Sequence, residues 1–256
     1  LISDTKIQIR GPLFRSHSMV FQATYAGVGA RVAITPAFVD VGPRFSLAPI
    51  DMLDVDVQLA WVGTWKGSSG LIPYDRLDGT LDAQRETRKG ESVAGQSVYA
   101  SVNPTFKIKL GPVIGFTSAD FAFVRVFKPE GETSPFVYDA YRDMVIAWDD
   151  VVLTSWTGLL AEILDGGDKR PLLRTGALLR HRQAFGSKDI TTALGGAVIV
   201  KPGPKPGWPT ITFAVLGYLR DVDRALKAPN IQLQLAWEIV KPLSKTRATD
   251  LAPAGS

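Results

Sequence analysis

The chain of 256 residues contains no cysteine, which excludes a disulfide framework and cysteine-based zinc sites. Its formal charge of +4 is small and acids are interleaved with the basic residues, so we predict no nucleic-acid partner. No run of about 18 apolar residues exists, which excludes a membrane-spanning helix. The hydrophobic fraction of 45% suits both a soluble protein and a transmembrane β-barrel, whose polar lumen dilutes an apolar exterior.

Apolar and polar residues alternate along most of the chain, which is the pattern of β-strands with one apolar and one polar face. Over 98–110, for example, Val102 and Phe106 share one face while Lys107 and Lys109 lie on the other. The sequence therefore predicts an all-β fold of about ten strands, each near or above the length that a tilted membrane strand needs. The predicted strands lie near 13–26, 30–47, 53–65, 98–110, 113–127, 150–164, 171–182, 190–200, 210–219 and 231–240.

Within the predicted strand 30–47 the apolar face switches from the parity of Val32 to that of Phe45. Gly42 and Pro43 lie at this switch. Because glycine and proline are tolerated at β-bulges, we predict a bulge at these two residues.

The predicted connections alternate between short and long, as in outer-membrane barrels with short periplasmic turns and long extracellular loops. Residues 136–148 are an extra strand or a folded-over loop, so twelve strands are an alternative to ten. The sequence thus predicts a single transmembrane antiparallel up-and-down β-barrel with both termini in the periplasm. Its parts are a periplasmic N-terminal segment at 1–12, the barrel at 13–241 and a C-terminal tail at 242–256, with extracellular loops at 66–96 and 128–149 and short turns at 48–52, 111–112, 165–170 and 201–207.

The apolar faces are predicted to meet lipid and the polar faces to line the lumen. Aromatic residues near strand ends predict two girdles at the membrane interfaces. The alternative is that these rings fill the core of a soluble β-sandwich, whose strands alternate similarly but are usually shorter. The outer girdle comprises Tyr25, Trp61, Trp65 and Phe127, and the periplasmic girdle Phe106, Trp208 and Trp237.

Charged residues on the predicted inward faces are balanced in number, which predicts a network of ion pairs, because buried charges require partners. About ten strands enclose little space, so we predict a largely plugged lumen. The predicted network comprises Lys107, Lys109, Arg174, Arg180 and Arg220 with Asp54, Asp56, Asp120, Glu162 and Glu238.

Arg125 departs from this pattern, because it shares the parity of the apolar Phe121 and Phe123. A charge at mid-membrane is unfavourable by about 2–4 kcal/mol in barrels. We therefore interpret Arg125 as a contact with lipid headgroups or with a partner protein.

Catalytic residue types are scarce. His17 and His181 are the two histidines, and Ser16 and Ser18 flank His17 on the opposite face of one strand. An adjacent Ser–His pair in a strand cannot form the hydrogen bond that nucleophilic catalysis needs. We therefore predict no enzymatic activity, no cofactor and no metal site.

The alternation, loop asymmetry and girdles resemble small bacterial outer-membrane β-barrel proteins over about 13–241. The resemblance implies a porin-like protein of the Gram-negative outer membrane, in contact with membrane lipid and lipopolysaccharide. A chain that begins at Leu1 is expected of an exported protein whose signal peptide has been removed. One departure is that many such barrels end on an aromatic residue, whereas a tail to Ser256 follows the last strand here.

Three functions remain open. The first is a non-enzymatic structural or anchoring subunit of an envelope complex, with envelope protein partners, or a narrow, largely plugged channel. The second is an outer-membrane enzyme that acts on lipid or peptide at the barrel rim. The third is a soluble lipocalin-like carrier with an apolar interior.

Overall fold

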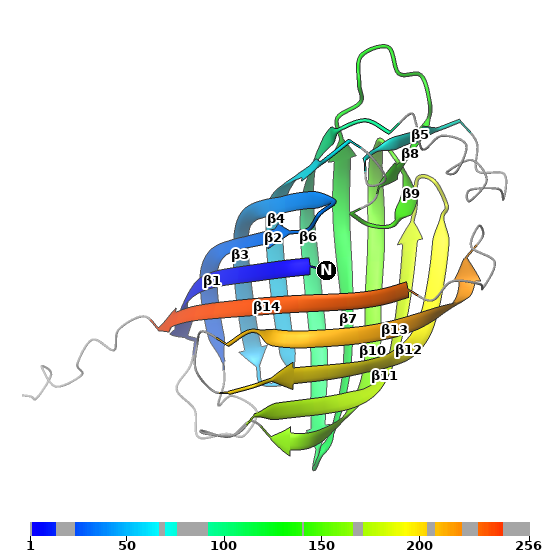
Figure 1. Ribbon diagram of the computed structural model, residues 1–256. Helices are drawn as coiled ribbons and strands as arrows, with labels where there is room; N and C mark the ends of the chain where they lie inside the picture. The colour runs from blue at the N-terminus through cyan, green and yellow to red at the C-terminus, as the bar shows by residue number, and fades with distance from the viewer. Residues whose placement is uncertain are drawn as a thin grey trace, which may run out of the picture.

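The computed structural model describes residues 2–13, 24–66, 70–75, 92–139, 141–165, 171–203, 208–221 and 230–242. The fold is all-β, as the alternation predicts. Eleven strands form a closed barrel, and three short strands form a separate sheet (Figure 1). Among the described residues, no helix is long and apolar enough to cross a membrane.

Around the barrel, each strand is hydrogen-bonded to its two neighbours, and the first strand lies beside the last. In this order the strands are β1 (Ile2–Pro12), β14 (Asn230–Pro242), β13 (Thr210–Asp221), β12 (Ile190–Lys201), β11 (Leu172–Ala184), β10 (Asp149–Asp165), β7 (Val113–Val126), β6 (Gly95–Leu110), β4 (Leu53–Thr64), β3 (Phe38–Ile50) and β2 (Tyr25–Ile34). In Figure 1, β7 and β10 run at a steep angle to β1 and β14.

The barrel closes through a parallel pair, which corrects three predictions. β1 runs parallel to β14, with Ile2 opposite Gln234 and Arg10 opposite Pro242. The barrel is therefore not entirely antiparallel and up-and-down, and residues 2–12 belong to it rather than preceding it. Because the two strands run in the same direction, the first residue of β1 and the last residue of β14 lie at opposite ends of the barrel. The prediction that both termini lie at one end is therefore wrong for these strands.

The predicted strand 30–47 is in fact parts of two strands, and the predicted bulge is absent. A turn at 35–37 separates β2 from β3, and the backbone N–H groups of Ala37 and Phe38 donate to Thr35 Oγ1 at 2.9 Å. The change of apolar parity occurs in this turn, not at Gly42 and Pro43. Gly42 instead permits close strand approach, because a Cβ there would lie 1.9 Å from the carbonyl oxygen of Leu59.

The two longest connections lie at one end of the barrel, as predicted, whereas the predicted strand 13–26 falls mainly between β1 and β2, where residues 14–23 are outside the described residues. Residues 65–94 join β4 to β6, and residues 127–148 join β7 to β10. We call this end the plug end. The tight turns at 51–52 and 111–112 lie at the other end, which we call the turn end.

A small sheet fills the barrel mouth at the plug end. It consists of β5 (Ile72–Tyr74), β8 (Phe136–Asp139) and β9 (Met144–Ala147). Its buried Val137, Met144 and Ile146 form one apolar cluster with inward-facing residues of the barrel strands, such as Val62 and Val124. The segment 136–148 is therefore a folded-in hairpin and adds no strand to the barrel. We call this sheet the plug.

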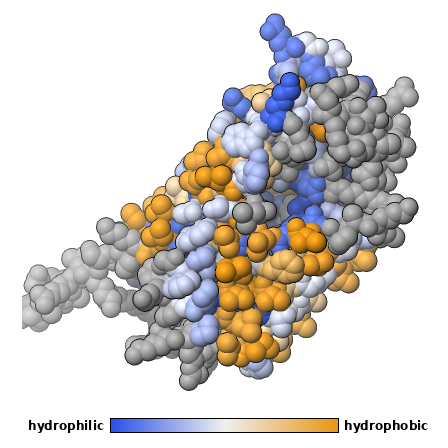
Figure 2. Space-filling view, viewed as in Figure 1, coloured by the Kyte–Doolittle hydropathy of each residue, from blue (hydrophilic) through white to orange (hydrophobic). Residues whose placement is uncertain are grey.

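Large apolar side chains cover the outside of the barrel. Every barrel strand carries at least one that is exposed, from Ile7 in β1 to Ile239 in β14. The most exposed include Leu159 at 61% and Ile231 at 64%. Figure 2 shows these apolar side chains over much of the visible outer face.

Candidate functional site: the barrel interior

Alternation in each strand turns every second side chain into the barrel, and the resulting interior has two unlike walls. Strands β14, β1, β2, β3, β4 and β6 contribute charged, amide and hydroxyl side chains, among them Asp4, Arg31, Gln58 and Ser101. Strands β10 to β13 contribute a buried apolar cluster that includes Leu160, Leu178, Ala197 and Leu216. The prediction of a polar lumen is therefore wrong for this part of the interior.

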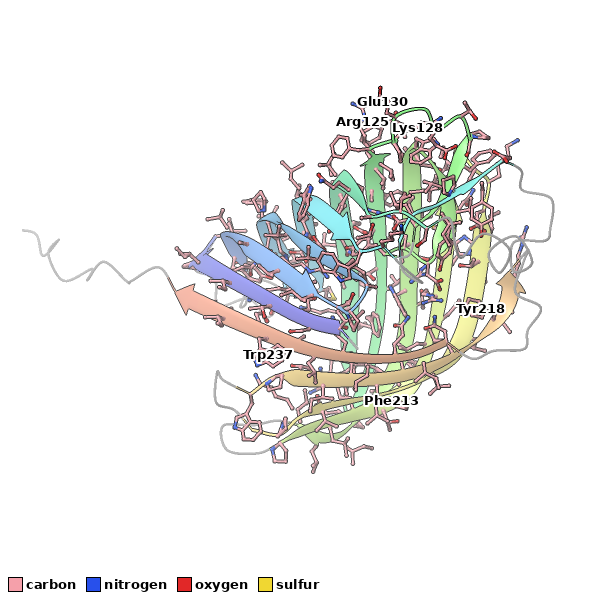
Figure 3. The ribbon with its side chains drawn as sticks, turned by 45° about the horizontal axis from the view of Figure 1, so that its top comes forward. Arg125, Lys128, Glu130, Phe213, Tyr218 and Trp237 are labelled. Atoms are coloured by element: carbon pink, nitrogen blue, oxygen red, sulfur yellow. The ribbon has the colours of Figure 1, made fainter. Side chains whose placement is uncertain are left out.

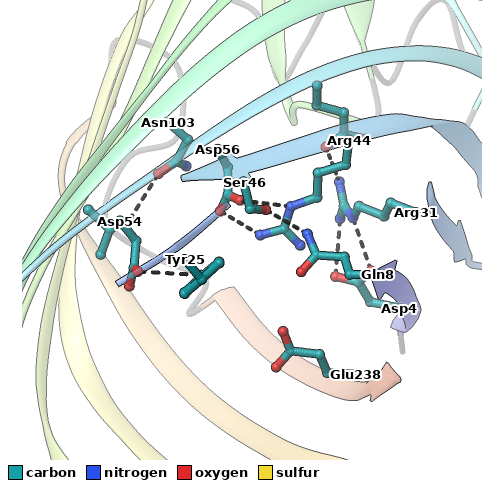
Figure 4. A network of polar contacts seen from close by, with 12 residues as sticks. Asp4, Gln8, Tyr25, Arg31, Arg44, Ser46, Asp54, Asp56, Asn103 and Glu238 are labelled. Carbon is teal, nitrogen blue, oxygen red and sulfur yellow. Dashed lines mark hydrogen bonds and ion pairs between the residues drawn. The ribbon is translucent and has the colours of Figure 1, made fainter. Parts of the chain in front are cut away.

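Arg31 in β2 is the centre of the polar wall. Its guanidinium pairs with Asp4 of β1 and Asp40 of β3, each with an N–O distance of 3.0 Å. Both carboxylates are almost fully buried, at 2% and 0% exposed. Gln234 of β14 also donates to Asp4, at 3.2 Å. The cluster thus ties the closing strands β14 and β1 to β2 and β3 (Figure 4).

Arg44 of β3 forms a second cluster beside the first. It forms two parallel hydrogen bonds with the Asp56 carboxylate of β4, from Nε at 2.9 Å and from Nη2 at 2.5 Å. Such bidentate pairs fix the geometry of both groups. Ser46 also donates to Asp56, and Gln8 donates to the Ser46 hydroxyl. Figure 4 shows the two arginines side by side within the polar wall.

A third group of charges lies inside the barrel near the turn end. Lys107 pairs with Asp54 at 2.5 Å, and Glu162 accepts from both Lys109 and Arg174. Glu238 pairs with Arg10. The side chains of Lys107 and Lys109 are 47% and 54% exposed, so solvent reaches the interior from this end.

The predicted ion-pair network is thus only partly assembled as expected. Asp54 with Lys107 and Glu162 with Lys109 and Arg174 pair within the predicted set, whereas Asp56 and Glu238 pair with the unpredicted Arg44 and Arg10. Asp120 forms a side-chain hydrogen bond with Ser101 and no ion pair among the described residues. Arg220 is exposed near the plug end, because a bulge in β13 shifts it opposite Thr192.

Arg180 is an inward-facing cation without a carboxylate partner among the described residues. It is 1% exposed, and its Nε and Nη1 groups have no hydrogen-bond acceptor. Its Nη2 donates to Tyr218 at 3.4 Å, and its guanidinium carbon lies 5.6 Å from the ring centroid of Trp156. Contacts with aromatic faces offset part of the unfavourable burial of this charge.

Hydrogen bonds hold the plug against the barrel wall. The Tyr141 hydroxyl, in the turn between β8 and β9, donates to Asp40 Oδ2 at 2.9 Å. Burial raises the pKa of the Tyr141 phenol, so the group keeps its proton and remains a donor. On the other wall, Arg182 donates to the carbonyl oxygen of Arg142 at 2.6 Å, and Asp189 accepts from the backbone N–H of Val145 at 2.8 Å.

Two adjoining cavities lie between the polar wall and the plug, with volumes of about 370 and 290 Å³. They share several lining residues, so we treat them as one space and call it the chamber. The chamber is lined by Asp4, Lys6, Arg31, Arg44, Asp56, Gln58, Tyr99, Ser101, Asn103, Asp120, Tyr141, Trp156 and Gln234, and toward the plug by Ile2, Phe38, Arg142 and Arg182.

Six of the seven predicted girdle aromatics lie on the outer face or at its edge. Trp61, Trp65 and Phe127 are exposed near the plug end, and Phe106 and Trp208 near the turn end. Trp237 is partly exposed on β14, and Figure 3 shows it on the outer side of that strand. Tyr25 is wrongly assigned, because it lies at the turn end and faces inward, where its hydroxyl donates to Asp54 at 3.4 Å.

Arg125 lies on the outer face, as its parity predicts, at the plug end where Figure 3 also places Lys128 and Glu130. It is paired with the exposed Asp149 at 2.6 Å, a partner that the sequence reasoning did not identify. His181 contacts Thr192 Oγ1 through Nδ1 at 3.0 Å. His17 lies outside the described residues.

Sequence reasoning missed the centre of the polar wall: Asp4, Arg31, Asp40 and Arg44. Asp4 was missed because residues 1–12 were placed before the barrel. The alternation of Lys6 and Gln8 with Ile7 and Ile9 was the signal that identifies this strand. Asp40 was missed because the predicted parity switch at Gly42 and Pro43 placed it on the outward face, whereas Arg44 has the predicted inward parity but was not included in the network.

Comparison with known proteins adds no relative: no family model, curated protein or solved structure matches the chain.

Proposed function

We propose that this protein is an integral outer-membrane β-barrel without enzymatic activity, which acts as an anchored envelope subunit or a narrow, largely closed channel. The observation that carries the proposal is the outer face, where exposed large apolar side chains occur on every barrel strand. Exposure of such an apolar surface to water is unfavourable, whereas contact with the hydrocarbon of a bilayer is favourable.

The distribution of outward-facing charges supports this proposal. Arg125 and Asp149 both lie at the plug end and neutralise each other as an ion pair. Arg220 is exposed at the same end. Charges near the end of a membrane barrel lie at headgroup level, where they are far less unfavourable than at the midplane. In this orientation the plug end is the extracellular end, because long loops of outer-membrane barrels face outward.

The closed interior favours a subunit or a narrow path over a general pore. Eleven strands enclose less space than the roughly sixteen of open porins. The plug fills one mouth, and the paired clusters of Arg31 and Arg44 occupy the polar wall behind it.

The two alternative functions have less support. A soluble carrier would bury its apolar faces and expose its polar ones, whereas the inward faces here hold the buried Asp4, Asp40 and Arg180. For a rim enzyme, the histidine that the structure describes, His181, contacts Thr192 and no carboxylate.

Planar-bilayer recording tests the closed interior. We expect the purified protein to show little steady conductance compared with a general porin. Replacing residues 136–147 with a glycine–serine linker should produce a large conductance, because it removes β8 and β9 from the mouth.

The matched control is Glu130→Gln, at an exposed residue of the same connection, which should conduct like the unaltered protein. Far-UV circular dichroism establishes that each variant keeps its β-structure. A large, stable conductance of the unaltered protein would contradict the closed interior.

A further inference from the structure

The polar wall of the chamber presents three hydrogen-bond donors that lack acceptors. Arg44 Nη1 and Gln58 Nε2 are buried without a partner. Lys6 forms no hydrogen bond or ion pair with any described residue, and all three side chains line the same cavity of about 370 Å³. Because unsatisfied buried donors are unfavourable, the two buried donors beside the unpaired Lys6 indicate a site for an acceptor.

The three donors come from β1, β3 and β4 and line one cavity, with β2 between β1 and β3. Arg44 lies directly opposite Gln58 in the β3–β4 pairing. Lys6 lines the same cavity as Arg44, together with the carboxylates of Asp4 and Asp56. The Asp56 carboxylate accepts from Arg44 Nε, Arg44 Nη2 and Ser46, but not from Arg44 Nη1 or Gln58 Nε2. Two adjacent cations with free N–H groups favour an anionic ligand.

Other residues of the chamber add hydroxyl, amide and aromatic groups beside these donors. Ser101 lies opposite Gln58 and Asn103 opposite Asp56 in the β4–β6 pairing, and Asp120 and Trp156 line the same cavity. Asp120 has no ion pair among the described residues and so retains acceptor capacity for ligand hydroxyl groups. An aromatic ring beside polar side chains suits a ligand with both C–H surfaces and hydroxyl groups.

We propose that the chamber binds a small hydroxylated anion, a sugar acid or a sugar phosphate. Its anionic group lies against Lys6, Arg44 Nη1 and Gln58 Nε2, and its hydroxyl groups face Asp120 and Ser101. The combined space of about 370 and 290 Å³ lies in the size range of small-molecule sites. The ligand reaches the chamber from the solvent-accessible turn end. This inference concerns the chamber alone and holds whether or not the barrel spans a membrane.

Calorimetric titration of the folded protein in detergent tests the proposal with four probes: glucuronate, glucose 6-phosphate, neutral glucose and inorganic phosphate. We expect at least one anionic sugar to bind about tenfold more tightly than glucose and than inorganic phosphate. Tighter binding of glucuronate identifies a carboxylate ligand, and tighter binding of glucose 6-phosphate a phosphate ligand.

Lys6→Gln should weaken this binding by about tenfold, because it removes one charge-assisted hydrogen bond. The variant is expected to fold, since Lys6 has no ion pair among the described residues to lose. The matched control is Lys109→Gln, which removes another inward-facing cation but leaves Glu162 paired with Arg174. No binding of either anionic sugar, binding no tighter than glucose or inorganic phosphate, or equal effects of the two substitutions would overturn the proposal.

Discussion

Asp40→Ala should lower the free energy of unfolding by about 3–5 kcal/mol. Asp40 is fully buried and accepts hydrogen bonds from Arg31, Tyr99 and Tyr141. Removing its carboxylate leaves these donors without their acceptor and separates the Tyr141 turn of the plug from the barrel wall. Urea unfolding of the detergent-solubilised protein, followed by tryptophan fluorescence, measures the change.

Asp54→Ala is the matched control for this substitution. Asp54 also pairs with a cation inside the barrel, but its partner Lys107 is 47% exposed. Solvent screens this pair, so we expect a loss of at most about 1 kcal/mol. If the two substitutions destabilised the protein equally, the plug would not depend on the buried Asp40 cluster.

Val102→Lys should lower the stability of the vesicle-inserted barrel by about 2–4 kcal/mol, because Val102 lies outward near the middle of β6. Thr105→Lys introduces the same charge in the same strand but on the inward face. Thr105 bonds to Asn103, and the next inward residue, Lys107, is already a solvated cation. We therefore expect little loss for Thr105→Lys. The free energy of unfolding is measured with denaturant in vesicles. Similar losses of stability for the two variants would argue against a barrel with lipid around its outer face and water in its interior.

Local alternation made most of the barrel predictable. The strands corresponding to β4, β6, β7 and β10 to β14 were predicted close to their observed bounds, because each has a long apolar face. β1 was missed because its outward Ser3 and Thr5 are polar, which shortens the apolar pattern to Ile7 and Ile9. The parallel pairing of β1 with β14 could not be predicted once β1 had been missed.

The interior contacts were much less predictable, because they depend on which strands become neighbours. Arg31 meets Asp4 only because β1 and β2 pair in a particular register. Likewise, the sequence does not distinguish which of several inward-facing cations pairs with Glu238. Its partner, Arg10, lies on β1, the strand that closes the barrel. The apolar wall was missed because the lumen was assumed to be polar on all sides.

Spin labelling tests most directly whether lipid surrounds the barrel, and the absence of cysteine in the chain allows single labels without background. Nitroxides are placed at the outward-facing Val57, Leu159 and Phe213 and at the inward-facing Thr105, with Glu130 as an aqueous loop control. In vesicles, we predict that labels at the three outward positions collide readily with oxygen and rarely with a water-soluble nickel chelate. The label at Thr105 should show the reverse preference. Nickel accessibility at Val57, Leu159 and Phe213 as high as at Glu130 would contradict a membrane-embedded barrel.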